Sequence, residues 1–247
     1  MYRFLIVAAC IASGAAMAAS PTPPAWRGTR GTSYLQWAFG TATNPAAPDT
    51  NTSSGNPVAA VIPGPFSTGW IDTIDVLGGA QGIWDLADGG TITIQLPGAR
   101  PMEYSEVWVQ ASYLQDMTVT PEIYVSGAEL TGTVITTLAT LPAGGSWRAI
   151  QTQWTFPHRA EQPTVTVKGS VEWGSVIDEV SIDSRLELAG DLNTDCVINL
   201  LDLIMVRNLL GADVSSGTNW KADVNRDGYI NILDLLRVRN LLSSICK

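Results

Sequence analysis

The sequence Asp191-Leu-Asn-Thr-Asp-Cys-Val-Ile-Asn-Leu-Leu-Asp202 recurs 32 residues later as Asp223-Val-Asn-Arg-Asp-Gly-Tyr-Ile-Asn-Ile-Leu-Asp234. When the comparison is continued to Leu210 and Leu242, thirteen of the twenty aligned positions are identical. Two neighbouring segments that agree this well indicate a repeated supersecondary unit. The pattern within each copy therefore decides how the end of the chain folds.

Each copy places oxygen-bearing groups where a twelve-residue calcium loop needs them. Such a loop supplies ligands from positions 1, 3, 5, 7, 9 and 12, because calcium binds six to eight oxygen atoms. For the first ion the predicted ligands are Asp191, Asn193, Asp195, the Val197 carbonyl, Asn199 and Asp202. For the second they are Asp223, Asn225, Asp227, the Tyr229 carbonyl, Asn231 and Asp234.

We expect two Ca²⁺ ions as cofactors, because the three carboxylates of each loop would repel one another without a cation. A series of Asx turns and helix caps is the alternative interpretation. It does not require three alternating oxygen-bearing residues followed by an acid at position 12.

Leucine-rich segments follow both loops directly. Asn199–Leu210 and Asn231–Leu242 have helical spacing, and we expect a helix in each. No helix is predicted before Asp191, where strand-like sequence ends. A calcium loop followed by a single helix, present twice, resembles a type I dockerin. The resemblance implies a calcium-dependent fold that docks onto a cohesin module, often within an extracellular polysaccharide-degrading system.

The same resemblance implies that the two helices carry the recognition surface. The candidate partner-binding residues occupy corresponding positions in the two copies: Leu200, Leu201, Val206, Arg207, Asn208, Ile232, Leu233, Val238, Arg239 and Asn240. Loop positions 10 and 11 are apolar in both copies, where many cellulosomal dockerins have a Ser-Thr-like polar pair. This departure implies a cohesin of another specificity, or docking to something else.

Two cysteines, Cys196 and Cys246, remain after the predicted signal peptide. In an exported protein such a pair favours a disulfide, with two free thiols as the alternative. Because a dockerin-like fold brings its ends together, the resemblance implies a disulfide that clasps the module. Cys196 also stands at position 6 of the first loop, where glycine would ease a positive φ. The calcium affinity of the first loop is therefore left open.

The first 18 residues have the features of a secretory signal peptide. Arg3 precedes the apolar run Phe4–Ile11, and Ala16-Met17-Ala18 supplies small residues for cleavage after Ala18. We expect a secreted protein, extracellular or associated with the cell surface, with no integral membrane segment after cleavage. The predicted division is a signal peptide over 1–18, a β-sandwich domain over 19–188 and a dockerin-like calcium-binding module over 189–247.

The long middle part of the chain is predicted to be an all-β sandwich or jelly roll. Several segments alternate apolar and polar residues with period two, as strands with one buried face do. The segment Pro45–Pro57 is polar and is predicted to be a long surface loop. The nine expected strands are Tyr34–Phe39, Ala59–Pro63, Thr91–Leu96, Glu106–Tyr113, Glu122–Val125, Thr133–Leu141, Trp147–Phe156, Thr164–Lys168 and Ser175–Asp183.

Tryptophans suggest a binding function for the sandwich. Indole rings stack on sugars, so a polysaccharide partner is expected, although most of the eight tryptophans in the domain are expected in its core. We assign Trp37, Trp108 and Trp154 to the core. The candidates for ligand stacking lie beside glycines in predicted loops: Trp70, Trp84 and Trp173. The net charge of −9, without clustered Lys and Arg, argues against nucleic acid as a partner.

The segment Gly174-Ser-Val-Ile-Asp-Glu-Val-Ser-Ile-Asp183 is similar to the last strand of jelly-roll carbohydrate-binding modules. The whole domain also resembles sandwiches of secreted planctomycete-type proteins, which carry no activity over to this chain. No G-x-S-x-G motif is present, and the single histidine, His158, is placed in a turn. We therefore expect the domain to be non-catalytic, with a hydrolase acting on glycosidic bonds as the alternative.

Three hypotheses follow. The first is a non-catalytic, secreted binding or scaffold protein that docks through the C-terminal module. The second is a small polysaccharide-active enzyme, a glycoside hydrolase or lyase, that uses carboxylates of the sandwich. The third is a structural cell-surface protein. For the enzyme, Asp178 and Glu179 are expected on opposite faces of one strand and hence not to act as a local pair; Glu103 and Glu106 are the other available acids.

Overall fold

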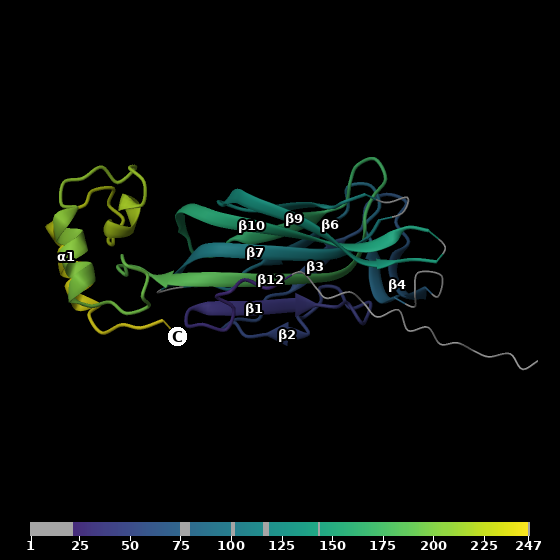
Figure 1. The fold of residues 1–247 in the computed structure, drawn as a ribbon, viewed down its shortest axis with the longest axis horizontal. Helices are drawn as coiled ribbons and strands as arrows, with labels where there is room; N and C mark the ends of the chain where they lie inside the picture. The colour runs from purple at the N-terminus through teal and green to yellow at the C-terminus, as the bar shows by residue number, and fades with distance from the viewer. Residues whose placement is uncertain (1–21, 75–79, 100–101, 116–118, 143, 247) are drawn as a thin grey trace, which may run out of the picture.

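The computed structural model describes residues 22–74, 80–99, 102–115, 119–142 and 144–246. These residues form a long β-sandwich with a small helical module at one end (Figure 1). The predicted signal peptide and its cleavage site lie outside the described residues. Within the described part of the chain, no helix combines the length and apolarity needed to cross a membrane.

The sandwich consists of two antiparallel sheets. The larger sheet contains, in spatial order, β2 (Thr50–Asn51), β1 (Thr32–Trp37), β12 (Val176–Leu188), β7 (Met102–Gln115), β10 (Ser146–Ala160) and β9 (Glu129–Thr140). It is extended by β5 (Ala80–Asp85), which pairs with β12, and by β4 (Gly69–Ile74), which pairs with β5. The smaller sheet contains β3 (Ala59–Ile62), β6 (Thr91–Gln95), β11 (Thr164–Lys168) and β8 (Glu122–Val125).

Alternating residues of the two sheets build the core between them. On β7, Val107, Val109 and Ala111 are fully buried and belong to the main hydrophobic cluster. Ile92 and Ile94 of β6 meet this cluster from the smaller sheet. Since successive strand residues point to opposite faces, every second residue of β7 lies on the outer face of the larger sheet. The predicted all-β sandwich is confirmed.

Three strands were missed by the prediction: β2, β4 and β5. Glycines led β4 and β5 to be interpreted as loops, yet Gly82 belongs to β5. It has φ of +73°, and a Cβ there would lie 2.3 Å from the Phe39 carbonyl oxygen, so the close approach of two backbones excludes a side chain. The surface loop predicted over Pro45–Pro57 is interrupted by β2 and by Ala46, which is buried and pairs with Ala59.

The helical module follows β12 almost without a connection. It contains α1 (Leu200–Asn208), the short 3₁₀ helix η2 (Asn219–Ala222) and α2 (Ile232–Asn240). The small core of the module includes Val206 of α1 and Val238 of α2, which are fully buried. An isolated bridge between Val197 and Ile245 brings the two ends of the module together. The predicted order of a sandwich followed by a small α module is confirmed.

Candidate calcium and docking site

The second loop brings its three predicted acidic ligands together. Carboxylate oxygens of Asp223, Asp227 and Asp234 all lie within 4.8 Å of one another. The Asp223 carboxylate also accepts hydrogen bonds from the N–H groups of Asp227, at 3.1 Å, and of Gly228, at 3.0 Å. Three carboxylates at this separation form a donor set that suits a hard divalent cation.

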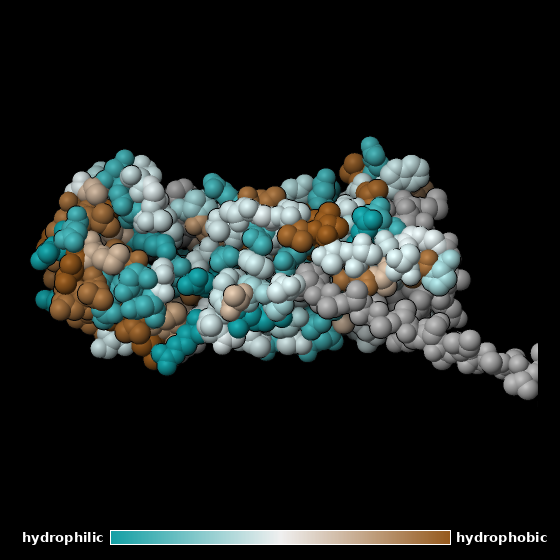
Figure 2. Space-filling model, viewed as in Figure 1, coloured by the Kyte–Doolittle hydropathy of each residue, from teal (hydrophilic) through white to brown (hydrophobic). Residues whose placement is uncertain are grey.

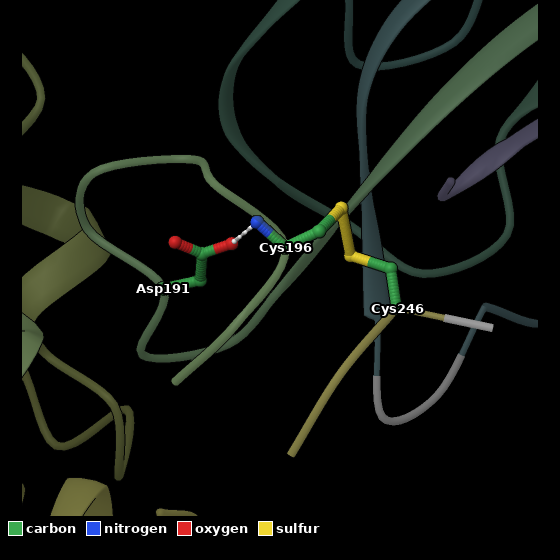
Figure 3. Close-up of side chains that lie close together, drawn as sticks. All are labelled: Asp191, Cys196 and Cys246. Atoms are coloured by element: carbon green, nitrogen blue, oxygen red, sulfur yellow. Dashed lines mark hydrogen bonds between the residues drawn. A yellow bond between two sulfur atoms is a disulfide. The ribbon is translucent and has the colours of Figure 1, made fainter. Parts of the chain in front are cut away.

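The first loop is folded in the same way around Asp191. This carboxylate accepts a hydrogen bond from the N–H of Asp195, at 3.3 Å. It accepts a second from the N–H of Cys196, at 2.8 Å, which Figure 3 shows. Burial raises the pKa of Asp191, and the neighbouring carboxylates of Asp202 and Asp195 raise it further. A bound cation would offset both effects, because it favours the ionised form.

The acid at position 12 organises the backbone of each loop. Asp202 and Asp234 are both fully buried. Asp234 accepts hydrogen bonds from the N–H of Asn225, at 3.0 Å, and from that of Asn231, at 2.9 Å. Asn231 is the N-cap of α2 and forms a capping box with Asp234, and Asn199 does the same with Asp202 on α1. The start of each helix is thereby fixed to its loop.

Position 6 has a left-handed backbone in both loops, with φ of +84° at Gly228 and +65° at Cys196. A cysteine is strained in this region, whereas glycine is not. Cys196 is joined to Cys246 by a disulfide with the Cα atoms 5.1 Å apart (Figure 3). Although both sulfur atoms lie near Asp191, the disulfide leaves no thiolate to bind a metal, so the oxygen donors remain the candidate ligands.

The two helices expose an apolar surface, which we call the helix face. Its most exposed members are Leu200, Leu201, Ile232 and Leu233, each more than half exposed. Figure 2 shows apolar side chains gathered on this end of the molecule, away from the sandwich. The flanking polar candidates are also exposed: Arg207, Asn208, Arg239 and Asn240.

Two of the expected recognition residues do not reach this surface. Val206 and Val238 are fully buried between the helices, because they occupy the face of each helix that packs inward. Sequence reasoning also missed three exposed apolar residues of the helix face: Ile204, Met205 and Leu236. Their spacing of three to four residues from the predicted members is the signal that would have identified them.

The comparison with protein families now bears on this geometry. The family model of the dockerin type I domain matches residues 189–243. These residues form a type I dockerin. No curated protein matches the chain. A dockerin implies calcium binding and a cohesin as partner, and dockerin modules belong to extracellular, cellulosome-type proteins.

The dockerin forms ion pairs with the sandwich from its second loop and from η2, and not from the helix face. Arg226, at position 4 of the second loop, forms ion pairs with Glu103 and Glu161. Lys221 pairs with Glu187 of β12 at 2.5 Å. The helices lie on the far side of these contacts, at the end of the long axis (Figure 1).

The tryptophan predictions need correction. Trp84 lies on β5 with 5% of its surface exposed, so it cannot stack on a ligand. Trp70 lies on β4, is half-buried, and donates its Nε1–H to the Phe39 carbonyl at 2.8 Å. Trp173 is 62% exposed in a turn. Trp108 was expected in the core, but it lies on the outer face, out of phase with the core residues Val107, Val109 and Ala111.

Two statements about possible catalytic groups also change. His158 belongs to β10, not to a turn. β12 contains a bulge between Ile177 and Glu179, which breaks the alternation that was expected to separate Asp178 from Glu179. Burial and the charge of Glu179 raise the pKa of Asp178 to about 6.

Proposed function

We propose that the protein is a secreted, non-catalytic β-sandwich protein that attaches through its dockerin to a cohesin-bearing partner and binds polysaccharide with its sandwich. The observation that carries the attachment is the exposed helix face at the end of the molecule opposite the sandwich. A soluble module with several adjacent, half-exposed Leu and Ile side chains suits a protein–protein interface.

Two Ca²⁺ ions would hold the dockerin in its folded form. The ligands would be the side chains at positions 1, 3, 5, 9 and 12 and the carbonyl at position 7 of each loop. The close carboxylates of Asp223, Asp227 and Asp234 support this assignment. An ion that binds the folded loops and not the unfolded chain contributes its binding free energy to folding.

Attachment is tested by passing a panel of cohesin modules over the immobilised full chain, with calcium and with excess EDTA. We expect at least one cohesin to be retained in calcium and released by EDTA. A double variant, Leu201→Asp with Leu233→Asp, should lose retention while it still binds calcium by titration calorimetry. Retention that persists in EDTA, or a double variant that docks normally, would contradict the proposed interface.

The apolar pair at positions 10 and 11 suggests what kind of cohesin to expect. In both loops this pair is largely exposed and hydrophobic, Leu200-Leu201 and Ile232-Leu233. A cohesin with an apolar contact surface should therefore be retained more strongly than one with a polar surface, because apolar side chains gain by leaving water.

The sandwich is assigned to polysaccharide binding because it displays aromatic and polar side chains on its surface, Trp173 among them. Affinity electrophoresis in gels that contain plant and algal polysaccharides tests this directly. Retardation without release of reducing sugars is the expected result. No retardation on any gel would favour a structural cell-surface protein.

A small polysaccharide-active enzyme is the second candidate, and Asp178 is the observation that favours it. A carboxyl group whose pKa is raised to about 6 can act as a general acid near neutral pH, and Glu179 lies beside it in the chain. A reducing-sugar or lyase assay on the same polysaccharides decides between the two candidates, since turnover that disappears in Asp178→Asn would establish the enzyme.

A further inference from the structure

The outer face of the larger sheet carries two cross-strand rows of polar and aromatic residues. The strand register places one row across β1, β12, β7 and β10, formed by Tyr34, Asp183, Trp108 and Gln153. The next row across the same strands is formed by Gln36, Ser181, Gln110 and Gln151. Amides, hydroxyls, a carboxylate and an indole thus lie side by side over four strands.

These side chains are more buried than the solvent face of a sheet requires. Gln110, Gln151, Ser181 and Asp183 are each less than 8% exposed. Glutamine and aspartate are mostly exposed residues, and a solvent-facing sheet surface normally leaves them in water. The outer face is therefore covered, although it has the composition of a surface.

The segment Thr22–Arg27 lies over this face and contacts four of its strands. The Thr22 carbonyl accepts a hydrogen bond from the Gln151 side chain of β10, at 3.3 Å. Trp26 meets Trp108 of β7 edge to face, with the ring centroids 6.1 Å apart. The chain therefore passes from β10 toward β12 within a few residues.

Arg27 fixes the end of this segment. Its guanidinium binds both carboxylate oxygens of Asp183, and it lies 4.1 Å from the centre of the Tyr34 ring. Since a bidentate arginine–carboxylate pair is the strongest of these contacts, Arg27 is the main anchor. The other contacts described for this segment are the Thr22 hydrogen bond and the edge-to-face packing of Trp26.

The same face continues toward the dockerin and ends in a cavity. A space of about 380 Å³ lies between the outer face and the segment that joins the two dockerin helices. Glu106 and Arg185 line it from the sheet, and Trp220 lines it from the dockerin. The polar rows therefore lead into a recess that has an aromatic wall of its own.

We propose that this outer face is the polysaccharide site of the sandwich and that Thr22–Arg27 is a cover that the glycan displaces. The proposal rests on the proposed function, and it names where the sugar chain binds. Sugar rings offer hydroxyl groups to Gln110, Gln151 and Asp183, and an apolar ring face to Trp108. The cover contacts Gln151 with a carbonyl oxygen, Trp108 with an indole edge and Asp183 with a guanidinium.

Competition by the cover has a measurable consequence. If the face is open for only a fraction of the time, the apparent dissociation constant equals the intrinsic constant divided by that fraction. Weakening the anchor raises the open fraction, so it tightens glycan binding without any new contact. Removing a group of the face itself has the opposite effect.

The test compares full-length variants by affinity electrophoresis on a polysaccharide that retards the wild-type protein. Arg27→Gln and Trp26→Ala each loosen the cover. We expect each variant to bind the polysaccharide at least about threefold more tightly than the wild type does. Trp108→Ala and Gln110→Ala remove parts of the face, and loss of the indole should weaken binding by about tenfold. Tyr124→Ala is the control, because this half-exposed aromatic lies on the smaller sheet.

Thermal unfolding of each variant ensures that only folded proteins are compared. If Trp108→Ala does not fold, Gln110→Ala alone tests the contribution of the face. Binding that survives Trp108→Ala and Gln110→Ala but disappears in Trp173→Ala would overturn the site and leave the polysaccharide function standing. Wild-type or weaker binding by both cover variants would overturn the role of Thr22–Arg27. Failure of the wild type and every variant to bind any polysaccharide would overturn the function and the site together.

Discussion

Replacing Arg226 by alanine removes the cation that joins the second calcium loop to the sandwich. Arg226 pairs with Glu103, whose side chain is 6% exposed, and with Glu161, which is 29% exposed. The variant leaves the Glu103 carboxylate in a site with little water. Loss of this charged partner raises the free-energy cost of keeping the ionised Glu103 carboxylate buried.

The size of the effect follows from how exposed the pair is. Removing one partner of a fully buried ion pair destabilises a protein by about 3–5 kcal/mol. The Arg226 side chain is 40% exposed, however, so solvent already screens part of the interaction. We therefore expect a loss of about 1–3 kcal/mol for Arg226→Ala.

This loss should also appear in calcium binding. The ion pairs exist only when the second loop is ordered, and calcium binds only the ordered loop, so the two share one folding free energy. A loss of about 1–3 kcal/mol raises the apparent dissociation constant of the second site by about fivefold to 150-fold. The first site, which does not contain Arg226, should change little.

Two measurements check these expectations. Urea unfolding followed by the helical circular dichroism signal, in excess calcium, reports the stability of the dockerin. Calorimetric titration of the calcium-free protein reports the affinity of each site. Arg237→Ala is the matched control, because this arginine is exposed on α2 of the same module. Equal midpoints and affinities for the two variants would refute the proposed coupling between loop and sandwich.

Three further outcomes are expected. Excess EDTA should remove the helical signal of the dockerin and leave the β signal of the sandwich, and an unchanged spectrum would contradict the calcium assignment. Cys196→Ser with Cys246→Ser should lower dockerin stability by about 2–4 kcal/mol, measured by urea unfolding, because the disulfide spans 50 residues. Asp178 has its pKa raised to about 6, so its ionised form destabilises the fold above that pH and the penalty vanishes below the unfolded pKa. Asp178→Asn should therefore stabilise the sandwich by up to about 3 kcal/mol near pH 7.5, and thermal unfolding at about pH 4 should show almost no gain.

The dockerin could be predicted from its sequence because its chemistry is local. The predicted ligands from Asp191 to Asp202 lie within twelve consecutive residues, and the helix begins inside the same stretch. The helix ends were overestimated by two residues, since the chain leaves the helical conformation after Asn208 and Asn240 and continues as turns. The order of the predicted ligands, the helix caps and the exposed Leu and Ile pairs are all determined by rules that act over a few residues.

Only the parts of the sandwich in which apolar and polar residues alternate with period two could be predicted from the sequence. The alternation on β7 identifies Val107, Val109 and Ala111 as core residues. The same alternation places Trp108 outside the core. The prediction missed this because tryptophan side chains are usually buried. β5 was missed because it contains a glycine. Inside a strand a glycine permits the close approach of another backbone, but in the sequence alone it indicates a turn.

Apart from the Cys196–Cys246 disulfide, the sequence analysis predicted no specific side-chain contact between distant segments. Arg226 and Glu103 are 123 positions apart, and Arg27 and Asp183 are 156 apart. Nothing in the neighbourhood of either arginine distinguishes it from an ordinary surface residue. The attachment of the dockerin and the cover of the outer face both depend on such pairs, so they emerge only once the chain is folded.

The short joint between β12 and the first calcium loop determines how the protein would be displayed. β12 ends at Leu188 and the first predicted ligand is Asp191, so only two residues separate the strand from the loop. A domain on a long flexible linker explores a volume that grows with linker length. This sandwich would instead keep a fixed orientation relative to the partner that binds its dockerin. Successive copies along a scaffold would then present their sheets at a repeating angle.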